Sequence, residues 1–253
     1  MTHSLHTLVR DLHRQRGRER RGLALAEGVR LVEEALAAGI AIRHVLASPA
    51  LEATPRGRTL KATLGQARTP LAEVSDLVFE SLAATEHPQG VLAVIEPPRW
   101  SLDDLRPGRR APTLVLDAVQ DPGNVGTLVR SAFALGAAGV LSLPGTAELG
   151  NPKTLRASMG GWFRLPCVSL DEAALRGWAA GLGVRVLLAT SGAPPLLPGD
   201  APLALVLGNE GAGIRPSLEE WAAGKVGVPL RQTAESLNVG VAAGILLYEA
   251  TRE

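Results

Sequence analysis

The chain has 253 residues, of which 46% are hydrophobic, and its 26 basic residues nearly balance its 25 acidic ones. This length suits one large domain or two small ones, and the composition excludes a disordered chain and a polycation. Because the chain has a single cysteine, Cys167, and no zinc-binding spacing among its five histidines, we expect no disulfide framework and no metal. No apolar run approaches the ~20 residues of a membrane span, and a signal-peptide core is lacking, which predicts a cytoplasmic protein.

The basic residues are unevenly distributed along the chain. Residues 10–21 alone hold six arginines and two acidic residues. Such a run is most often the solvated face of a helix. The alternative is an arm that contacts phosphates, because the guanidinium fork pairs well with phosphate oxygens. The residues by themselves leave both interpretations open.

The first predicted domain comprises residues 1–98. Apolar side chains recur at helical spacing over residues 27–38. Short β-rich segments follow at 42–48, 69–75 and 89–96, and helical stretches separate them. This alternation predicts a small α/β sandwich. A stretch rich in proline and arginine comes next, and it predicts a linker over 99–112.

The second predicted domain comprises residues 113–253. Its apolar runs are nearly continuous, as in strands of a parallel sheet that is buried on both faces. The predicted strands are 113–119, 137–143, 185–190 and 203–208, and the predicted helices are 125–136, 152–159, 171–181, 217–222 and 237–250. Strands that alternate with helices in this way predict an α/β domain.

Ligand sites in open α/β sheets lie beyond the carboxyl ends of the strands, and three segments with unusual polar residues occupy such places. The first is LDAVQDPGNVGTLVRSAFALGA, residues 116–137. Asn124 is a natural N-cap for the helix that follows. Arg130 comes less than two turns later, so both side chains can face a ligand at the helix N-terminus, which attracts anions.

The second segment is LVLGNEGAGI, residues 205–214. Its glycines, Gly208, Gly211 and Gly213, read G-x-x-G-x-G, whereas a dinucleotide fold requires G-x-G-x-x-G. This order argues against an oxidoreductase with a dinucleotide site. Glu210 is either a plain turn residue or a functional carboxylate placed just past a buried strand.

The third segment is VGVPLRQTAESLNVGVAAGILLYEA, residues 226–250. Ser236, or a residue next to it, can cap the last helix. Asn238 is less easily explained, because asparagine is unfavourable inside an apolar helix. Small residues from Gly240 to Gly244 give this helix a smooth face, which permits close packing against another helix of this chain or of a second subunit.

In their order and spacing, these three segments resemble the signature motifs of the SpoU/TrmH family of RNA ribose methyltransferases. The resemblance covers residues 113–253. The first half of the chain resembles the family's RNA substrate-binding domain, a ribosomal-protein-type module. That likeness rests on AEGVRLVEEAL, residues 26–36, and on TEHPQGVLAVIEPP, residues 85–98, and it is commonest in members that act on ribosomal RNA.

The resemblance implies the transfer of a methyl group from S-adenosylmethionine to a ribose 2′-hydroxyl of RNA, with 23S ribosomal RNA as the expected substrate. It also implies a homodimer formed through the methyltransferase domain, whose parallel sheet carries a deep trefoil knot. A transfer RNA methyltransferase and a non-catalytic RNA-binding protein with the same fold remain the alternatives. The residues do not separate housekeeping modification from antibiotic resistance, and they do not identify the nucleotide.

The family's functional residues carry over by position. The expected catalytic residues are Asn124, Arg130, Glu210, Ser236 and Asn238, and the expected cofactor-binding residues are Gly208, Val228 and Leu237, with Thr190 as a further candidate. The family proposal makes Arg130 a general base, but arginine stays protonated in proteins, which favours a phosphate clamp instead. The sequence departs from the third motif at Gln232, where glycine is usual, and at Gly240, where serine is common.

Overall fold

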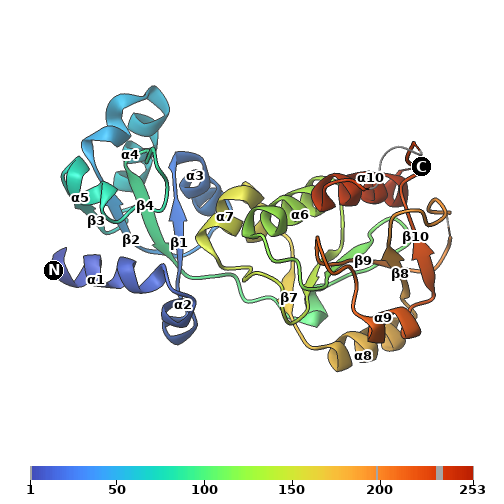
Figure 1. Cartoon of the computed structure of the whole chain (residues 1–253). Helices are drawn as coiled ribbons and strands as arrows, with labels where there is room; N and C mark the ends of the chain where they lie inside the picture. Colours follow the sequence, from blue (N-terminus) through green and yellow to red (C-terminus); the bar gives the residue numbers. More distant parts are fainter. Residues whose placement is uncertain (1, 198, 232–235, 253) are drawn as a thin grey trace. The chain divides into compact units, whose positions relative to one another are not determined.

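The computed structural model describes residues 2–197, 199–231 and 236–252 (Figure 1). Within these residues, no helix is both long enough and apolar enough to cross a membrane. By its internal contacts the chain divides into two units, which are described separately below. The first unit contains residues 1–99 and 150–163, and the second contains residues 100–149 and 164–253.

The first unit is built on a mixed sheet with the strand order β1-β4-β2-β3. Its strands are β1 (Ala24–Glu27), β2 (Ile42–Ala47), β3 (Leu71–Glu73) and β4 (Val91–Ile95). Strand β4 runs antiparallel to both β1 and β2, and β3 lies parallel to β2 at the edge. The helices are α1 (Thr2–Leu12), α2 (Gln15–Arg21), α3 (Val29–Ala37), α4 (Pro55–Gln66), α5 (Asp76–Glu80) and α7 (Pro152–Ser158), with 3₁₀ turns η1 (Pro49–Ala53) and η3 (Gly161–Phe163).

An apolar cluster fixes α1 and α5 against this sheet. Leu12 of α1, Phe79 of α5, and Leu46 and Leu92 of the strands are all buried in it. The small α/β domain predicted for the first half of the chain is therefore present. The predicted helix 27–38 begins two residues later, because Glu27 ends strand β1, which the sequence analysis missed.

Helix α7 belongs to the first unit although it comes from the second half of the sequence. It packs against β1, and its Arg156 pairs with the buried Glu27 of that strand, with Nη1 and Oε2 3.5 Å apart. Gly160 follows α7 with a φ of +87°, and a Cβ atom there would lie 2.7 Å from the Cβ of Glu34 on α3. Only glycine permits this close approach.

The arginine run of residues 10–21 forms the end of α1 and most of α2. Arg18 is buried and donates hydrogen bonds to the carbonyl oxygens of Leu12 and His13. Arg20 and Arg21 both pair with Asp11. Half of the arginines therefore stabilise the helix pair, while the other half, Arg10, Arg14 and Arg16, are exposed.

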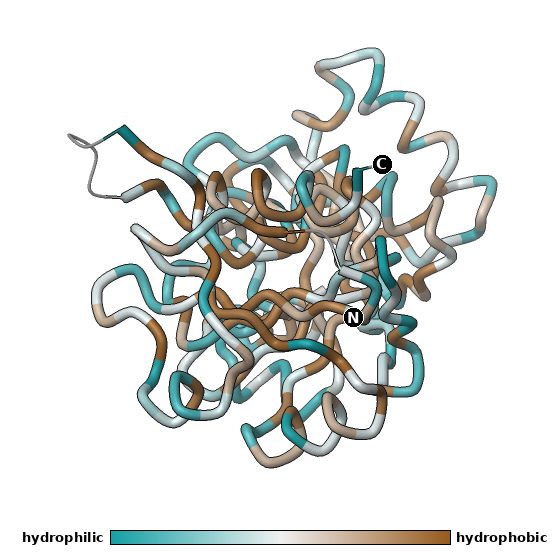
Figure 2. The backbone as a smooth tube through the Cα atoms, turned by 90° about the vertical axis from the view of Figure 1, so that its right-hand side faces the viewer, coloured by the Kyte–Doolittle hydropathy of each residue, from teal (hydrophilic) through white to brown (hydrophobic). Residues whose placement is uncertain are grey.

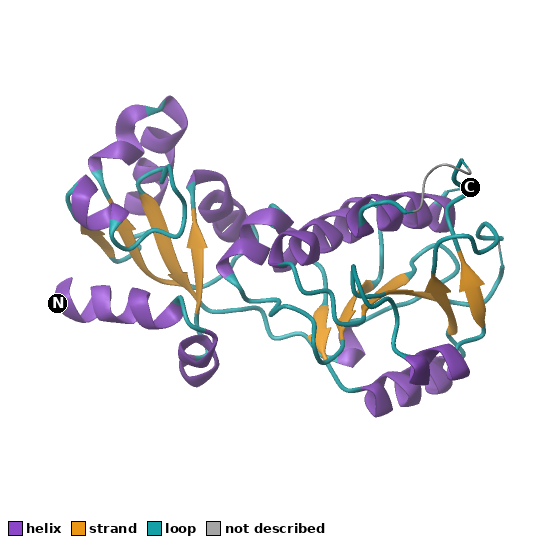
Figure 3. Cartoon of the chain, viewed as in Figure 1, coloured by secondary structure: helices purple, strands orange, loops and turns teal. Residues whose placement is uncertain are grey.

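The second unit is built on a parallel sheet with the order β10-β8-β9-β5-β6-β7 (Figure 3). Its strands are β5 (Thr113–Leu116), β6 (Gly139–Ser142), β7 (Cys167–Ser169), β8 (Arg185–Ala189), β9 (Leu203–Leu207) and β10 (Gly224–Val226). The helices are α6 (Pro122–Ala134), α8 (Glu172–Leu182), α9 (Pro216–Trp221) and α10 (Val239–Thr251), with the 3₁₀ turn η2 (Leu102–Asp104).

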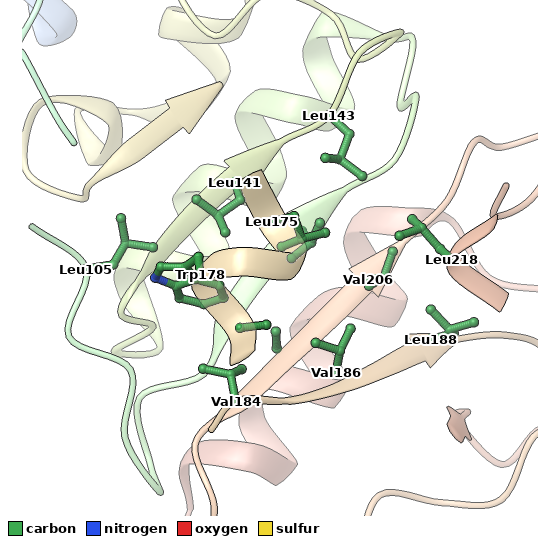
Figure 4. Packing of buried hydrophobic residues seen from close by; sticks show 13 residues of the cluster. Leu105, Leu141, Leu143, Leu175, Trp178, Val184, Val186, Leu188, Val206 and Leu218 are labelled. Carbon is green, nitrogen blue, oxygen red and sulfur yellow. The ribbon is translucent and has the colours of Figure 1, made fainter. Parts of the chain in front are cut away.

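The helices of the second unit cover both faces of its sheet. Helices α6 and α10 lie along one face, and α8 and α9 lie on the other (Figure 1). Strand residues such as Val186 and Val206 pack with Leu175 and Trp178 of α8 and with Leu218 of α9 (Figure 4). Because both faces are covered, β9 is apolar along its whole length and β5 is apolar after Thr113, and hydrophobic stretches of this kind stand out in Figure 2.

The predicted α/β fold class with a parallel sheet is confirmed, and the predicted strands and helices of this half are all present. The edge strands β7 and β10 were missed because each has only three residues. The segment 99–112, predicted as a linker, carries η2 and a tight turn between Gly108 and Ala111. Its Leu105 is buried in the same core as Trp178. The trefoil knot and the functional domain boundaries stay predictions.

Candidate active site

A cavity of about 560 Å³ opens at the carboxyl ends of β8, β9 and β10. The segments just past these strands line it, together with the loop after β9 and the first turns of α10. It contains most of the predicted site residues, namely Thr190, Gly208, Glu210, Val228, Ser236, Leu237 and Asn238. This is the position that the strand order of an open α/β sheet predicts for a ligand site.

The loop after β9 is held in a closed turn by Asn209. Its backbone exchanges two hydrogen bonds with Gly213, at 2.9 and 3.0 Å. Its side-chain oxygen accepts from the N–H groups of Gly211 and Ala212, and its amide nitrogen donates to the carbonyl of Ala118 beyond β5. A Cβ on Gly208 would lie 2.5 Å from the carbonyl carbon of Gly213, so the turn requires glycine there. Asn209 is not among the site residues predicted from the sequence.

A buried ion pair anchors the far end of the same loop. Asp117, at 1% exposure, follows β5 and accepts hydrogen bonds from the backbone N–H of Arg215, at 2.8 Å, and from its Nε, at 2.6 Å. Arg215 also donates to the carbonyl of Pro144 after β6. This pair was not predicted from the sequence either. An acidic residue that directly follows a buried strand was the available signal, since a buried carboxylate needs a partner.

Polar residues of the three motifs form one chain of hydrogen bonds beside the cavity. Asn124 of α6 donates from Nδ2 to Glu210 Oε1, at 2.9 Å, and accepts at Oδ1 from Asn238 Nδ2, at 3.2 Å. Gln120 donates its backbone N–H to the other oxygen of Glu210, at 3.4 Å. The structure therefore brings together the predicted residues Asn124, Glu210 and Asn238.

These hydrogen bonds keep Glu210 ionised. Partial burial works in the opposite direction, but the donors from the Asn124 side chain and from the backbone of Gln120 and Asp121 outweigh it and lower the pKa of Glu210 below its usual value. Glu210 is also the one charged side chain among the described residues that line the cavity. The cavity is therefore anionic.

Two capping roles differ from those considered for the sequence. Asp121, not Asn124, caps α6, because its Oδ1 accepts from the backbone N–H of Asn124, at 2.9 Å. This leaves the Asn124 side chain available to Glu210. Asn238 is not inside the last helix but is its N-cap and accepts from the N–H of Gly240, which explains an asparagine at this position. Ser236 lies two residues before this cap and is exposed.

The small residues of α10 pack inside this chain. Gly240 is buried, and a Cβ there would lie 3.0 Å from Cγ2 of Thr127 on α6. The departure from serine at Gly240 thus accompanies a close approach of α6 and α10. The other departure, Gln232, lies outside the described residues.

Arg130 is exposed on α6 and does not line the cavity. Among the described residues, no hydrogen bond or ion pair joins it to Glu210, Asn124 or Asn238. Phe133, three residues later, is exposed as well, so Arg130 belongs to an outward stripe of α6. Its catalytic role stays a prediction.

Comparisons with known proteins identify the two halves of the chain. A model of the SpoU rRNA methylase family matches residues 111–248, and one of the MRM3-like substrate binding domain matches residues 8–93. The 23S rRNA (guanosine(2553)-2′-O)-methyltransferase RlmP of Bacillus subtilis is 35% identical over 94% of this chain and 92% of its own length. The 23S rRNA (uridine(2479)-2′-O)-methyltransferase of Streptomyces viridochromogenes is 32% identical over 93% and 85%.

A solved structure has the same fold over nearly the whole chain. The SpoU methyltransferase AviRb of Streptomyces viridochromogenes, in complex with AdoMet, matches with a TM-score of 0.85 and 29% identity, and the match covers 96% of this chain and 95% of that one. The family predicted from the three motifs is confirmed. This chain belongs to the SpoU rRNA methylase family.

Proposed function

We propose that this chain transfers the methyl group of S-adenosylmethionine to a ribose 2′-hydroxyl of 23S ribosomal RNA. The observation that carries the proposal is the hydrogen-bond chain Glu210–Asn124–Asn238, which joins all three motifs beside one cavity. Three curated relatives named as 23S rRNA 2′-O-methyltransferases support the substrate class. A cytoplasmic location is consistent with a ribosomal RNA substrate, and it stays a prediction.

The cavity suits this cofactor in volume and in charge. Sites for ligands of this size measure ~300–1,000 Å³, which includes the 560 Å³ found here. When bound, S-adenosylmethionine supplies an electrophilic methyl group on a cationic sulfonium. An anionic cavity favours that cation and disfavours the pyrophosphate of a dinucleotide, which removes the oxidoreductase alternative. The backbone groups of Gly208, Val228 and Leu237 would hold the cofactor, because all three residues line the cavity.

The polar chain orients the groups that meet the ribose. Each amide nitrogen of Asn124 and Asn238 donates one of these hydrogen bonds and has a second N–H with which to donate. These donors hold ribose oxygens in line with the methyl group, and such alignment lowers the barrier of a displacement. Glu210 fixes the rotamer of Asn124. Arg130 stays protonated and acts as a phosphate clamp for the RNA, not as a base, so the 2′-hydroxyl proton leaves to water as the oxygen–methyl bond forms and the sulfur–methyl bond breaks.

A homodimer is the second part of the proposal. Helices α6 and α10 expose large apolar side chains, with Phe133 at 43%, Val241 at 51%, Ile245 at 38% and Tyr248 at 55%. A second copy of this chain would remove this apolar surface from water. Because Arg130 lies on the same outward stripe of α6 as Phe133, the dimer would place it at the border of the interface. Sedimentation of the wild type and of Ile245→Glu tests this, and a monomeric wild type contradicts it.

Methyl transfer is tested with radiolabelled S-adenosylmethionine and purified 23S rRNA, 16S rRNA and tRNA, followed by mapping of the modified ribose. We expect label in 23S rRNA and none after Asn124→Ala, with Glu219→Ala, which does not line the cavity, as the active control. Label in tRNA alone would overturn the substrate class. Binding of RNA without any heat on titration with the cofactor would favour a non-catalytic RNA-binding protein.

A further inference from the structure

A second cavity of about 290 Å³ lies at the amino-terminal ends of the strands of the parallel sheet, opposite the first cavity. Arg185 and Leu203, the first residues of β8 and β9, line it, whereas the last residues of the same strands line the cofactor cavity. At ~3.3 Å per residue, the length of β8 separates the two cavities by about 13 Å. The second cavity is therefore distinct from the proposed catalytic site.

Four arginines line this cavity: Arg109, Arg110, Arg185 and Arg252. Among the described residues, the one carboxylate that lines this cavity is Glu249, which is 2.6 Å from Arg252; Asp200, outside the lining, is 3.4 Å from Arg109. Asp200 is 93% exposed, so water screens its contribution strongly. An excess of positive charge therefore faces the cavity, in contrast to the anionic cofactor cavity.

Hydrogen bonds fix the backbone that carries two of these arginines and hold the side chain of a third. Arg109 and Arg110 are the two central residues of a tight turn, which Gly108 and Ala111 close with reciprocal hydrogen bonds of 3.2 Å. Arg185 is half-buried and donates to the carbonyl of Leu197, at 3.4 Å. Arg185 therefore loses less conformational freedom on binding an anion than Arg109 and Arg252, whose side chains are 62% and 55% exposed.

Gly199 closes one side of the cavity. A Cβ at this position would lie 3.4 Å from Nη2 and 3.6 Å from Cζ of Arg185, which is ordinary contact distance. A side chain at position 199 therefore reaches the Arg185 guanidinium without displacing backbone. This geometry provides a means of changing the charge of the cavity without removing any arginine.

We propose that this arginine cavity binds a backbone phosphate of the RNA, several nucleotides away from the methylated ribose. The planar guanidinium group of an arginine matches the two free oxygens of a phosphodiester, and four arginines line this cavity. The inference rests on the proposed function for the identity of the anion, since RNA is the polyanion that the enzyme must hold. Apolar atoms of Leu196 and Leu203 beside the arginines would contact the sugar next to that phosphate.

The test compares Gly199→Asp with the nearly isosteric, uncharged Gly199→Asn. Binding of a 23S rRNA fragment is measured by filter retention at a series of salt concentrations, and S-adenosylmethionine binding is measured by calorimetry. We expect Gly199→Asp to raise the RNA Kd at least tenfold and to lower the salt slope by ~0.7 to 0.9 for each phosphate that the protein no longer neutralises. We expect Gly199→Asn to stay within about twofold of the wild type, and cofactor affinity to be unchanged in both. The double variant Arg109→Ala/Arg110→Ala should reproduce the aspartate result.

Equal RNA affinity and salt slope in the two Gly199 variants would overturn the proposal. Inorganic phosphate is titrated as well: a millimolar or tighter site for it, with RNA binding unaffected by Gly199→Asp, would make this a small-anion site and also overturn it. If instead the proposed function is wrong, the experiments give a different result. In that case the wild type transfers no methyl group to any RNA, while the effect of Gly199→Asp on RNA binding persists.

Discussion

The buried pair of Asp117 and Arg215 is the interaction whose removal we expect to disturb the cofactor cavity most. Asp117 follows β5, and Arg215 ends the loop that carries Gly208 and Glu210. The carboxylate of Asp117 accepts from both the backbone and the side chain of Arg215. Replacing Asp117 by alanine therefore removes an acceptor from two donors and leaves the guanidinium without its counterion.

The cost follows from the burial of the two partners. Removing one partner of a fully buried ion pair lowers the free energy of unfolding by ~3–5 kcal/mol. Arg215 is 29% exposed, so water solvates part of its unpaired guanidinium, and we expect about 2–3 kcal/mol for Asp117→Ala. Asp117→Asn keeps an acceptor for the Arg215 backbone but loses the charge, and we expect about 1–2 kcal/mol. For a chain of this length the alanine variant should lose roughly 5–10 °C in Tm.

Urea unfolding and cofactor titration measure the two consequences. The matched control is Glu219→Ala, which removes the exposed Lys225–Glu219 pair of the same unit and should cost less than about 1 kcal/mol. We expect the Kd for S-adenosylmethionine to rise for Asp117→Ala and to stay unchanged for the control. If Asp117→Ala were as stable as Glu219→Ala and bound the cofactor equally well, the ion pair would have no structural role and the reasoning would be refuted.

Three further predictions concern single titratable groups. Burial raises the pKa of the Cys167 thiol, so it should react with iodoacetamide only after unfolding, and rapid labelling of the native chain would contradict its position in β7. Hydrogen bonds lower the pKa of Glu210; its stabilising effect is complete above its unfolded-state pKa of about 4.3 and is lost as pH falls through the lower folded-state value. The stability difference between wild type and Glu210→Gln should therefore be constant from about pH 6 to 8 and shrink only below about pH 4.3. Glu27→Gln leaves the Thr85 and Arg156 donors with a weaker acceptor, and native-state hydrogen exchange should rise at Thr85 but not at Leu12.

The fold was predictable where an element is long or fully buried. Strands β5 and β9 read as strands because both of their faces are covered, and α10 reads as a helix because its apolar pattern continues for more than ten residues. The short strand β1 was not predictable, because its four residues precede a strong helical pattern and are fixed only by pairing with β4, far along the chain. The placement of α7 against β1 depends equally on long-range contacts.

Three of the residues that meet beside the cavity were predictable one by one, but their network was not. Motif spacing identified Asn124, Glu210 and Asn238, but hydrogen bonds over 86 and 114 positions connect them. No local rule gives such pairings. The same limit explains the missed Asp117–Arg215 pair, which spans 98 positions. Arg130 shows the converse: its spacing from Asn124 suggested a shared ligand, but six residues on a helix turn it away from Asn124 by about 120°, toward an outward stripe.

The opposite charges of the two cavities follow from what each would hold. A sulfonium is favoured where Glu210 is the one charged lining group among the described residues, and arginines in that cavity would repel it. RNA, however, needs positive charge, and Glu210 repels phosphates near the reacting ribose. A protein with nearly zero net charge can favour both the sulfonium and the RNA only if its arginines lie apart from the cofactor. Here they lie at the amino-terminal ends of the sheet strands and on the outward stripe of α6. Uncharged amide donors from Asn124 and Asn238 can then face the ribose, because they attract neither ion strongly and repel neither.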